Sequence, residues 1–243
     1  MKNNIRIGNC GYGRTKRDEY PHVFPVVEIQ QTFYQPPQIK TLEKWRAEVP
    51  AEFEFTLKAW QLITHESSSP TFRRLRRKLT DKEMAEAGFF KPTEIVREAL
   101  ETTLACAKAL KARTILFQCP AKFKPTTENI ENLRQFINGI KRGKLNFAWE
   151  PRGGWDPLLV KDICEELDLW HTVDPFVQTT ATPKNCYFRL HGTPRWRYTY
   201  EEGELEELAS MLPKRRLAYV FFNNITMRED AVRLQTIVDE NNS

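Results

Sequence analysis

Acidic, basic and amide side chains follow short apolar segments throughout this sequence. The segment from Lys144 to Arg152 is the clearest case: apolar residues alternate along it, and it ends in Glu150, Pro151 and Arg152. Because proline has no N–H to give to a strand, Glu150 and Arg152 lie where a strand must stop. A carboxylate and a guanidinium at such a position can accept a proton and hold an anion.

The same arrangement recurs along the chain. The residues at the ends of the apolar segments are Glu28, Lys58, Gln118, Glu150 with Arg152, Asp174, Arg189 with His191, and Asn223 with Asn224, and His65 follows the third segment closely. These residue types suit acid–base chemistry and bidentate hydrogen bonding, which indicates a functional site. A structural alternative stays open, because the three carboxylates match three of the cations and could form a self-neutralising plug.

The apolar segments themselves have the features of β-strands. Several alternate apolar and polar residues with a period of two, and several end at a proline. Strands are predicted at residues 5–12, 26–30, 53–59, 113–119, 145–150, 169–174, 186–192 and 217–224.

Helical patterns separate most of these strands. Apolar residues recur at helical spacing over residues 41–49, 93–110, 127–140, 157–167, 201–211 and 229–240. Thr41 and Thr93 are the predicted N-caps of the first two helices. Residues 60–92 lack the regular pattern and are too many for an ordinary loop, so a mostly helical excursion is predicted there.

The alternation of strands and helices predicts parallel strands with right-handed crossovers. Eight such units in 243 residues have the size and number of a single (β/α)8 TIM-type barrel. We predict one barrel domain over residues 1–243, with 60–92 as an enlarged loop inserted over the C-terminal rim, where such barrels build their sites. A doubly wound open sheet is the alternative, and no strand is followed by the G-x-G-x-x-G motif that would favour it.

Composition excludes several classes of protein. Hydrophobic residues are 40% and charged residues 28%, which permits a packed core, and no apolar run approaches the ~18 residues of a membrane span. No signal peptide is visible, so a cytoplasmic location is the default expectation. The five cysteines are widely spaced without a C-x-x-C pair, which predicts buried free thiols. A Cys119 nucleophile is a weaker alternative, and no G-x-S-x-G serine motif is present.

A basic run lies within the irregular region. Much of the net charge of +5 comes from Arg73, Arg74, Arg76, Arg77 and Lys78. A solvated helix face would explain the run, and a polyanionic partner would also fit it.

The motifs resemble those of the YecE-like family, domain of unknown function 72. They run in order along nearly the whole chain: Val27 to Tyr34, Trp45, Phe55 to Ala59, Ile63 to His65, Leu116 to Pro120, Trp149 to Arg152, Val173 with Asp174, Tyr187 to Gly192, and Tyr219 to Asn224. The resemblance implies a TIM barrel and transfers no settled activity. The sequence departs from the usual pattern at Gln31 and Cys119, neither of which removes a charged residue of the expected site.

The favoured interpretation is metal-independent acid–base chemistry of the hydrolase or lyase type on a phosphorylated or nucleic-acid-derived substrate. Glu150 would be the base, Lys58 or His191 the acid, and Arg152 or Arg189 would hold a small anionic or phosphorylated ligand. The expected site list is completed by Glu28 and Asp174 as catalytic residues, and by Gln118, His65, Tyr34, Asn223 and Asn224 as substrate-binding residues. No cofactor is predicted.

Two other interpretations stay open. Glu28, Glu150, Asp174 and His191 could bind Mg²⁺, Mn²⁺ or Zn²⁺ in a metal-dependent hydrolase or isomerase. Alternatively, the basic run could bind nucleic acid, with Tyr34, Trp60 or Trp196 stacking on bases. The sequence predicts no membrane partner and gives no oligomeric state.

Overall fold

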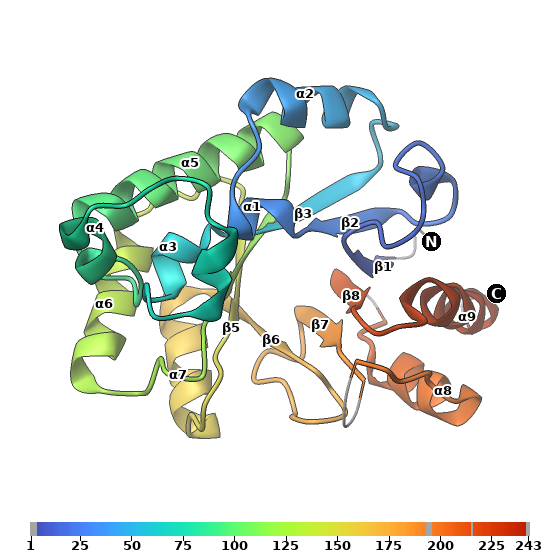
Figure 1. The fold of residues 1–243 in the computed structure, drawn as a ribbon. Helices are drawn as coiled ribbons and strands as arrows, with labels where there is room; N and C mark the ends of the chain where they lie inside the picture. Colours follow the sequence, from blue (N-terminus) through green and yellow to red (C-terminus); the bar gives the residue numbers. More distant parts are fainter. Residues whose placement is uncertain (1–3, 193–195, 215, 242–243) are drawn as a thin grey trace. The chain divides into compact units, whose positions relative to one another are not determined.

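Eight parallel strands form a closed barrel in the order β1 to β8 (Figure 1). The computed structural model describes residues 4–192, 196–214 and 216–241. The strands are β1 Ile5–Cys10, β2 Val26–Ile29, β3 Glu54–Lys58, β4 Thr114–Gln118, β5 Asn146–Glu150, β6 Leu169–Val173, β7 Cys186–Leu190 and β8 Ala218–Phe222. All eight lie within the predicted ranges, and the predicted (β/α)8 barrel is confirmed.

Helices follow most of the strands, but residues 174–185 between β6 and β7 contain no helix, and only a 3₁₀ helix lies between β1 and β2. The α-helices are α1 Gln31–Tyr34, α2 Ile39–Ala47, α3 Gln61–Thr64, α4 Asp81–Glu86, α5 Glu94–Leu110, α6 Thr127–Asn138, α7 Pro157–Leu167, α8 Glu202–Met211 and α9 Met227–Glu240, and two 3₁₀ helices are η1 Tyr20–His22 and η2 Pro70–Arg74. None of the helices in the described ranges is both long and apolar enough to cross a membrane.

The strands are buried along nearly their whole lengths. Every residue of β4, β6, β7 and β8 is buried, as expected for parallel strands covered on both faces. All five cysteines are free and buried, which confirms the prediction made from their spacing.

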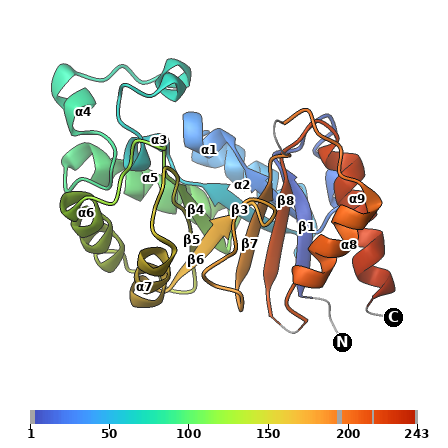
Figure 2. The same ribbon diagram turned by 90° about the horizontal axis from the view of Figure 1, so that it is seen from below.

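The chain divides into two compact units. Unit 1 contains residues 1–28, 49–54 and 170–243, and unit 2 contains residues 29–48 and 55–169. In unit 1, β8 pairs with β1 and with β7, and α9 packs against both β1 and β8. Figure 2 shows α8 and α9 side by side along this group of strands. In unit 2, β4 pairs with β3 and β5, while α2 and α3 pack against the long helix α5.

The irregular region between β3 and α5 is less helical than predicted. Its three helices, α3, η2 and α4, have four, five and six residues and are separated by turns and extended segments. Local capping explains their ends: the Ser69 side chain accepts from the backbone of Thr71, and Thr80 forms a capping box with Glu83. The position of this region over the barrel rim stays a prediction.

Thr93 is the N-cap residue of α5, as predicted, whereas the predicted cap at Thr41 is wrong. Thr93 does not cap α5 through its side chain, because its hydroxyl donates to the carbonyl of Glu86 and ties α5 to the end of α4. Thr41 lies inside α2, which begins at Ile39. The short helix α1 was not predicted, since its four residues are too few for an apolar period to be visible.

Candidate active site

The ends of three neighbouring strands bring Lys58, Gln118 and Glu150 together in unit 2. Lys58 is the last residue of β3, Gln118 of β4 and Glu150 of β5, and Gln118 is the register partner of Glu150. Nζ of Lys58 donates to Oε1 of Gln118 over 2.6 Å. Parallel pairing places these side chains at one edge of the sheet, as the strand-end pattern in the sequence requires.

Helix α1 contacts both the side chain and the backbone of Lys58. Its side chain is buried, and Nζ lies 3.6 Å from the centre of the Phe33 ring, a cation–π distance. The hydroxyl of Thr32 donates to the carbonyl of Lys58 over 2.7 Å, which fixes the end of β3 against the same helix. No role was predicted for Thr32 or Phe33 from the sequence, although both lie in the motif that follows Glu28.

Glu150 and Arg152 form an ion pair at the end of β5. Nε of Arg152 donates to Oε1 of Glu150 over 2.7 Å, and the Arg152 side chain is 41% exposed while that of Glu150 is 9% exposed. The guanidinium therefore extends from a buried carboxylate toward solvent, where it can meet an incoming anion. The carbonyl of Glu150 also accepts from the backbone N–H of Cys119, which joins the ends of β4 and β5.

His65 belongs to the same group of side chains. Its Nδ1 lies 2.8 Å from the hydroxyl of Thr64, and its ring packs edge-on against Phe33. Burial, together with the positive charges of Lys58 and Arg152, lowers the pKa of His65 to about 3, and the negative charge of Glu150 only partly opposes this. His65 is therefore a neutral imidazole near pH 7, surrounded by two cations and one carboxylate.

A strained segment is bound to α3, the helix that ends just before His65. Gly88, Phe89 and Phe90 all have positive φ values, which is uncommon for aromatic residues. The backbone N–H of Gly88 donates to Leu62 over 2.8 Å, and that of Phe90 donates to Ile63 over 2.9 Å. These bonds attach the segment to α3. The Gly-Phe-Phe sequence gives no local sign of this conformation, because positive φ is unusual for phenylalanine.

A pocket of about 370 Å³ lies among residues of the segments that follow His65 and Gln118 in the chain. It is lined by Glu66, Ser68, Ser69, Pro70, Phe89, Pro120, Ala121 and Lys122. Glu66 directly follows His65, and Pro120 is two residues after Gln118. Nζ of Lys122 donates to the hydroxyl of Ser68 over 3.4 Å, which places a cation in the wall of the pocket. The lining thus contains one cation, Lys122, and one carboxylate, Glu66.

Unit 1 contains a second group of predicted site residues. The buried carboxylate of Glu28 accepts from Nη2 of Arg189 over 3.0 Å and from the hydroxyl of Tyr187 over 2.7 Å. Arg189 also contacts Sγ of Cys10, whose pKa is raised by burial and by the charge of Glu28. Tyr187 was missed by the sequence analysis, although its position two residues before Arg189 puts both side chains on one face of β7.

Asp174 and His191 are also linked in unit 1. One carboxylate oxygen of Asp174 accepts from the backbone N–H of His191 over 3.0 Å, and the other accepts from Phe176 over 3.2 Å. Nδ1 of His191 lies 3.0 Å from the carbonyl of Arg189. The carboxylate of Asp174 thus holds the turn after β6 and the end of β7.

The two asparagines after β8 have different positions. The backbone N–H of Asn223 donates to Leu190 and continues the pairing of β8 with β7. Nδ2 of Asn224 donates to Asp230 over 2.6 Å and to the carbonyl of Tyr198 over 2.8 Å, so this side chain anchors the start of α9. Nothing in these contacts places Asn224 beside a ligand.

The basic run divides into bound and exposed cations. Arg77 pairs with both Glu83 and Glu98, whereas the guanidinium carbon of Arg74 lies 3.5 Å from the centre of the Tyr34 ring. Arg73, Arg76 and Lys78 are exposed. Trp60 is buried and cannot stack on a base, whereas Trp196 is 55% exposed.

The carboxylates predicted as metal ligands have other partners. Within the described ranges, no three His, Cys, Asp or Glu side chains are arranged to hold a metal ion. A metal at Glu28 would have to displace Arg189 and Tyr187 from the two carboxylate oxygens. The donor set therefore does not fit the metal site considered from the sequence.

Comparison with known proteins identifies relatives over nearly the whole chain. Residues 11–241 match the family described as "Protein of unknown function DUF72". UPF0759 protein YunF of Bacillus subtilis (strain 168) is 24% identical over 272 aligned positions, which cover 90% of this chain and 88% of that protein.

Solved structures agree on the fold. A DUF72 family protein from Enterococcus faecalis V583 has a TM-score of 0.74 at 21% identity and covers 97% of this chain and 95% of its own. More distant barrels include a D-psicose 3-epimerase with a TM-score of 0.61 and a family 2 AP endonuclease from Brucella melitensis with a TM-score of 0.58. Each is 10% identical to this chain, and each match covers 95% of this chain and 97% of the other. At these identities the likeness concerns the barrel alone.

Proposed function

The chain belongs to the DUF72 family of proteins of unknown function, and we propose that it is an enzyme that carries out acid–base chemistry on a phosphorylated or nucleic-acid-derived substrate. The reaction is of the hydrolase or lyase type. The observation that carries this proposal is the grouping of Lys58, Gln118, Glu150 and Arg152 with a neutral His65 at the ends of β3 to β5.

The charge of this group suits an anionic substrate. Lys58 and Arg152 contribute two positive charges and Glu150 contributes one negative charge, while His65 is neutral because its pKa is about 3. A phosphate or carboxylate of the substrate would balance the remaining positive charge. Arg152, which is partly exposed, is the residue that would first contact it through a bidentate hydrogen bond.

The remaining side chains supply the proton transfers. Glu150 is the proposed base, because its carboxylate is buried beside the group and is oriented by Arg152. Lys58 is the proposed acid in preference to His191, since Lys58 belongs to the same group of strand ends as Glu150. Because His65 is neutral, its N–H would donate a hydrogen bond to the substrate and would add no positive charge to the site. Gln118 orients Lys58 through its amide oxygen.

The residues of unit 1 have supporting roles in this proposal. Glu28 and Arg189 neutralise each other in the interior, and Asp174 holds the backbone at His191. Their contacts suit positioning better than proton transfer.

The fold of the distant neighbours is compatible with this chemistry. One neighbour is a D-psicose 3-epimerase crystallised in the presence of D-fructose, and another is an AP endonuclease. Both names belong to enzymes, which supports an enzyme here. Because the proposed site is positively charged, we take sugar phosphates and oligonucleotides with a base missing as the first substrates to test.

The test is a turnover assay on these two substrate classes, with Glu150→Gln as the critical variant. Turnover by the native protein and a loss of about 100-fold or more in Glu150→Gln are expected, because a positioned base contributes roughly 10²–10⁴-fold. Glu166→Gln, which removes an exposed carboxylate paired with Arg134, is the matched control and should keep full activity. Reaction in ¹⁸O-labelled water separates the two reaction types, since hydrolysis by attack at phosphorus places the label in the product phosphate, whereas elimination leaves that phosphate unlabelled. Equal activity of Glu150→Gln and Glu166→Gln would contradict the assignment of Glu150.

A further inference from the structure

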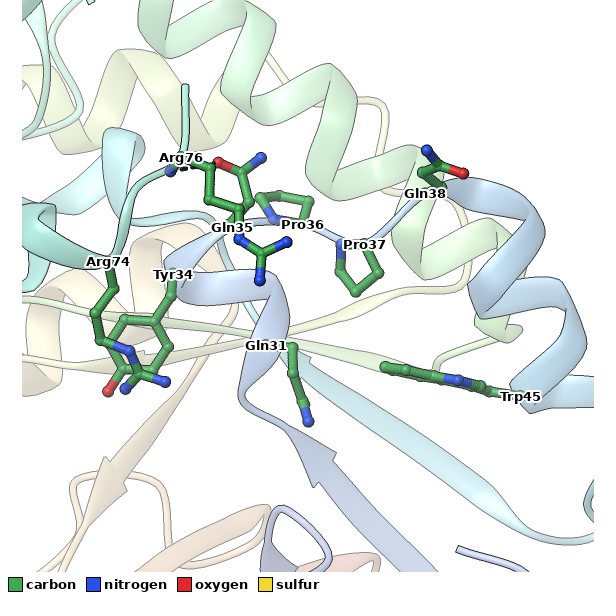
Figure 3. A pocket seen from close by; sticks show the side chains of 9 residues that line it. All are labelled: Gln31, Tyr34, Gln35, Pro36, Pro37, Gln38, Trp45, Arg74 and Arg76. Atoms are coloured by element: carbon green, nitrogen blue, oxygen red, sulfur yellow. Dashed lines mark hydrogen bonds between the residues drawn. The ribbon is translucent and has the colours of Figure 1, made fainter. Parts of the chain in front are cut away.

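Unit 2 has a second pocket, of about 420 Å³, that the proposed chemistry does not use. It lies between α1 and α2 and is lined by Gln31, Tyr34, Gln35, Pro36, Pro37, Gln38, Trp45, Arg74 and Arg76 (Figure 3). Its volume is within the range of pockets that hold a nucleotide-sized ligand, roughly 300–1,000 Å³. None of its lining residues is acidic.

One end of the pocket is a stacked pair of planar groups. The guanidinium of Arg74 lies over the ring of Tyr34 with its carbon 3.5 Å from the ring centre, and Figure 3 shows the two planes together. The carbonyl of Tyr34 accepts from Nε2 of buried Gln61, which fixes the end of α1. A flat aromatic ligand can continue such a stack on the outer face of the guanidinium.

The other walls contain two prolines and side chains that can hydrogen-bond. Trp45 from α2 is half-buried at the far end, and Pro37 and Gln31 lie between it and Tyr34 in Figure 3. The prolines fix the backbone of this wall. Gln31 and Gln38 are exposed, and their amides offer paired donors and acceptors of the kind that match base edges.

The basic run borders the pocket in a fixed position. Oε1 of Gln35 accepts from the backbone N–H groups of Arg76 and Arg77 over 3.1 and 3.3 Å. Arg77 is in turn bound by Glu83 and Glu98, so it anchors the run. Arg73, Arg76 and Lys78 stay exposed around this anchor, where they can contact phosphates.

We propose that this pocket and the basic run together bind single-stranded nucleic acid, with one unpaired base on the Arg74–Tyr34 stack and the neighbouring phosphates on Arg73, Arg76 and Lys78. The combination of a stacking surface with a row of cations is the arrangement by which single strands are bound without sequence readout. A duplex does not fit, because its bases are stacked on one another and cannot enter a pocket of this size. The proposal is independent of the acid–base proposal, since the two share no residue in the chemistry each describes.

The experiment measures binding of a fluorescein-labelled oligothymidylate to the full chain by fluorescence anisotropy, at low and at moderate salt. The critical variants are Tyr34→Leu, which keeps an apolar side chain without a ring, and Arg74→Gln with Arg76→Gln. The control replaces Lys141 and Lys144, two exposed lysines before β5, by glutamine and removes the same charge. Thermal melting establishes that each variant is folded.

Binding that weakens with salt and falls about tenfold in Tyr34→Leu and in the double arginine variant, but not in the double lysine variant, is the expected result. Equal losses in the arginine and lysine variants would overturn the proposal, because binding would then follow net charge alone. Three other outcomes would also overturn it. These are tighter binding of a duplex, the absence of binding at low salt, and competition by polyglutamate that is as strong as competition by unlabelled oligothymidylate. Turnover in the Glu150 assay is measured separately, so failure of one proposal leaves the other standing.

Discussion

The backbone of Gly88 lies directly against His65. A β-carbon at position 88 would come within 2.5 Å of both the carbonyl carbon and the carbonyl oxygen of His65, and the φ of Gly88 is +85°. Both facts require glycine at this position. The close approach packs the backbone of His65 against the segment that continues into Phe89 and Phe90.

Replacing Gly88 by alanine should therefore lower the free energy of unfolding by more than the backbone strain at position 88 alone would. Alanine at a positive φ costs about 1 kcal/mol, and the clash with His65 should raise the loss to roughly 2–3 kcal/mol in urea unfolding. Gly154→Ala is the control, because Gly154 has a φ of +79° and no atom within 4 Å of an added β-carbon. Equal losses at the two positions would show that the contact with His65 has no energetic role.

The buried His65 should make the stability of the protein depend on pH. Its pKa is about 3 in the folded chain and about 6.5 in the unfolded chain, so the unfolded state binds more protons between these values. The contribution to stability is complete above about pH 6.5 and is lost as the pH falls toward 3. When the pH is lowered from 7 to about 4.5, the free energy of unfolding of the native protein should fall on the order of 2 kcal/mol more than that of the His65→Gln variant.

Urea unfolding of the two proteins across this pH range checks the prediction. Glutamine can keep a hydrogen bond to Thr64 and does not titrate, so the difference between the two curves isolates the imidazole. Parallel curves, or an imidazole resonance of His65 that titrates near pH 6.5, would contradict the low pKa.

The sequence predicted the barrel because its signals are local. Proline after Cys119, Glu150 and Asp174 marks strand ends, and apolar segments of five to eight residues alternate with amphipathic helices. Glu150 was predicted as the last residue of its strand, and Lys58 and Gln118 were predicted one residue before the ends of theirs; in the structure all three are the last strand residues. Strand ends can be read from sequence because each depends only on its own few residues.

Contacts between distant elements could not be read in this way. Asn224 follows a strand as a site residue would, yet its amide is bound by Asp230, because the turn into α9 brings the two together. The hydroxyl of Thr93 likewise bonds to Glu86 instead of capping α5. The positive φ values of Phe89 and Phe90 run against the preference of bulky residues, so only the packing around them can enforce the conformation.

The buried thiols should be unreactive in the folded protein. Burial raises the pKa of Cys106 and Cys186 to about 11 and that of Cys164 to about 12, and it also raises the pKa of Cys10 and Cys119. Since the thiolate is the reactive form, Ellman's reagent should modify native thiols only as fast as the protein opens, and all five should react quickly in denaturant. A single fast thiol in the native protein, lost in Cys119→Ser, would instead support a nucleophile at the end of β4.

Replacing only one partner of the buried ion pair Glu28–Arg189 should lower the stability of the protein strongly. Both side chains are almost fully excluded from solvent, so Arg189→Met leaves the Glu28 carboxylate without its guanidinium and should cost roughly 3–5 kcal/mol. Arg134→Met, which breaks a half-exposed pair with Glu166, should cost less than about 1 kcal/mol. Adding Glu28→Gln to Arg189→Met should recover part of the loss, because a neutral amide needs no counter-charge. Urea unfolding of the four proteins of this cycle gives the coupling energy, and additive losses would mean that the pair is not the dominant electrostatic contact of either residue.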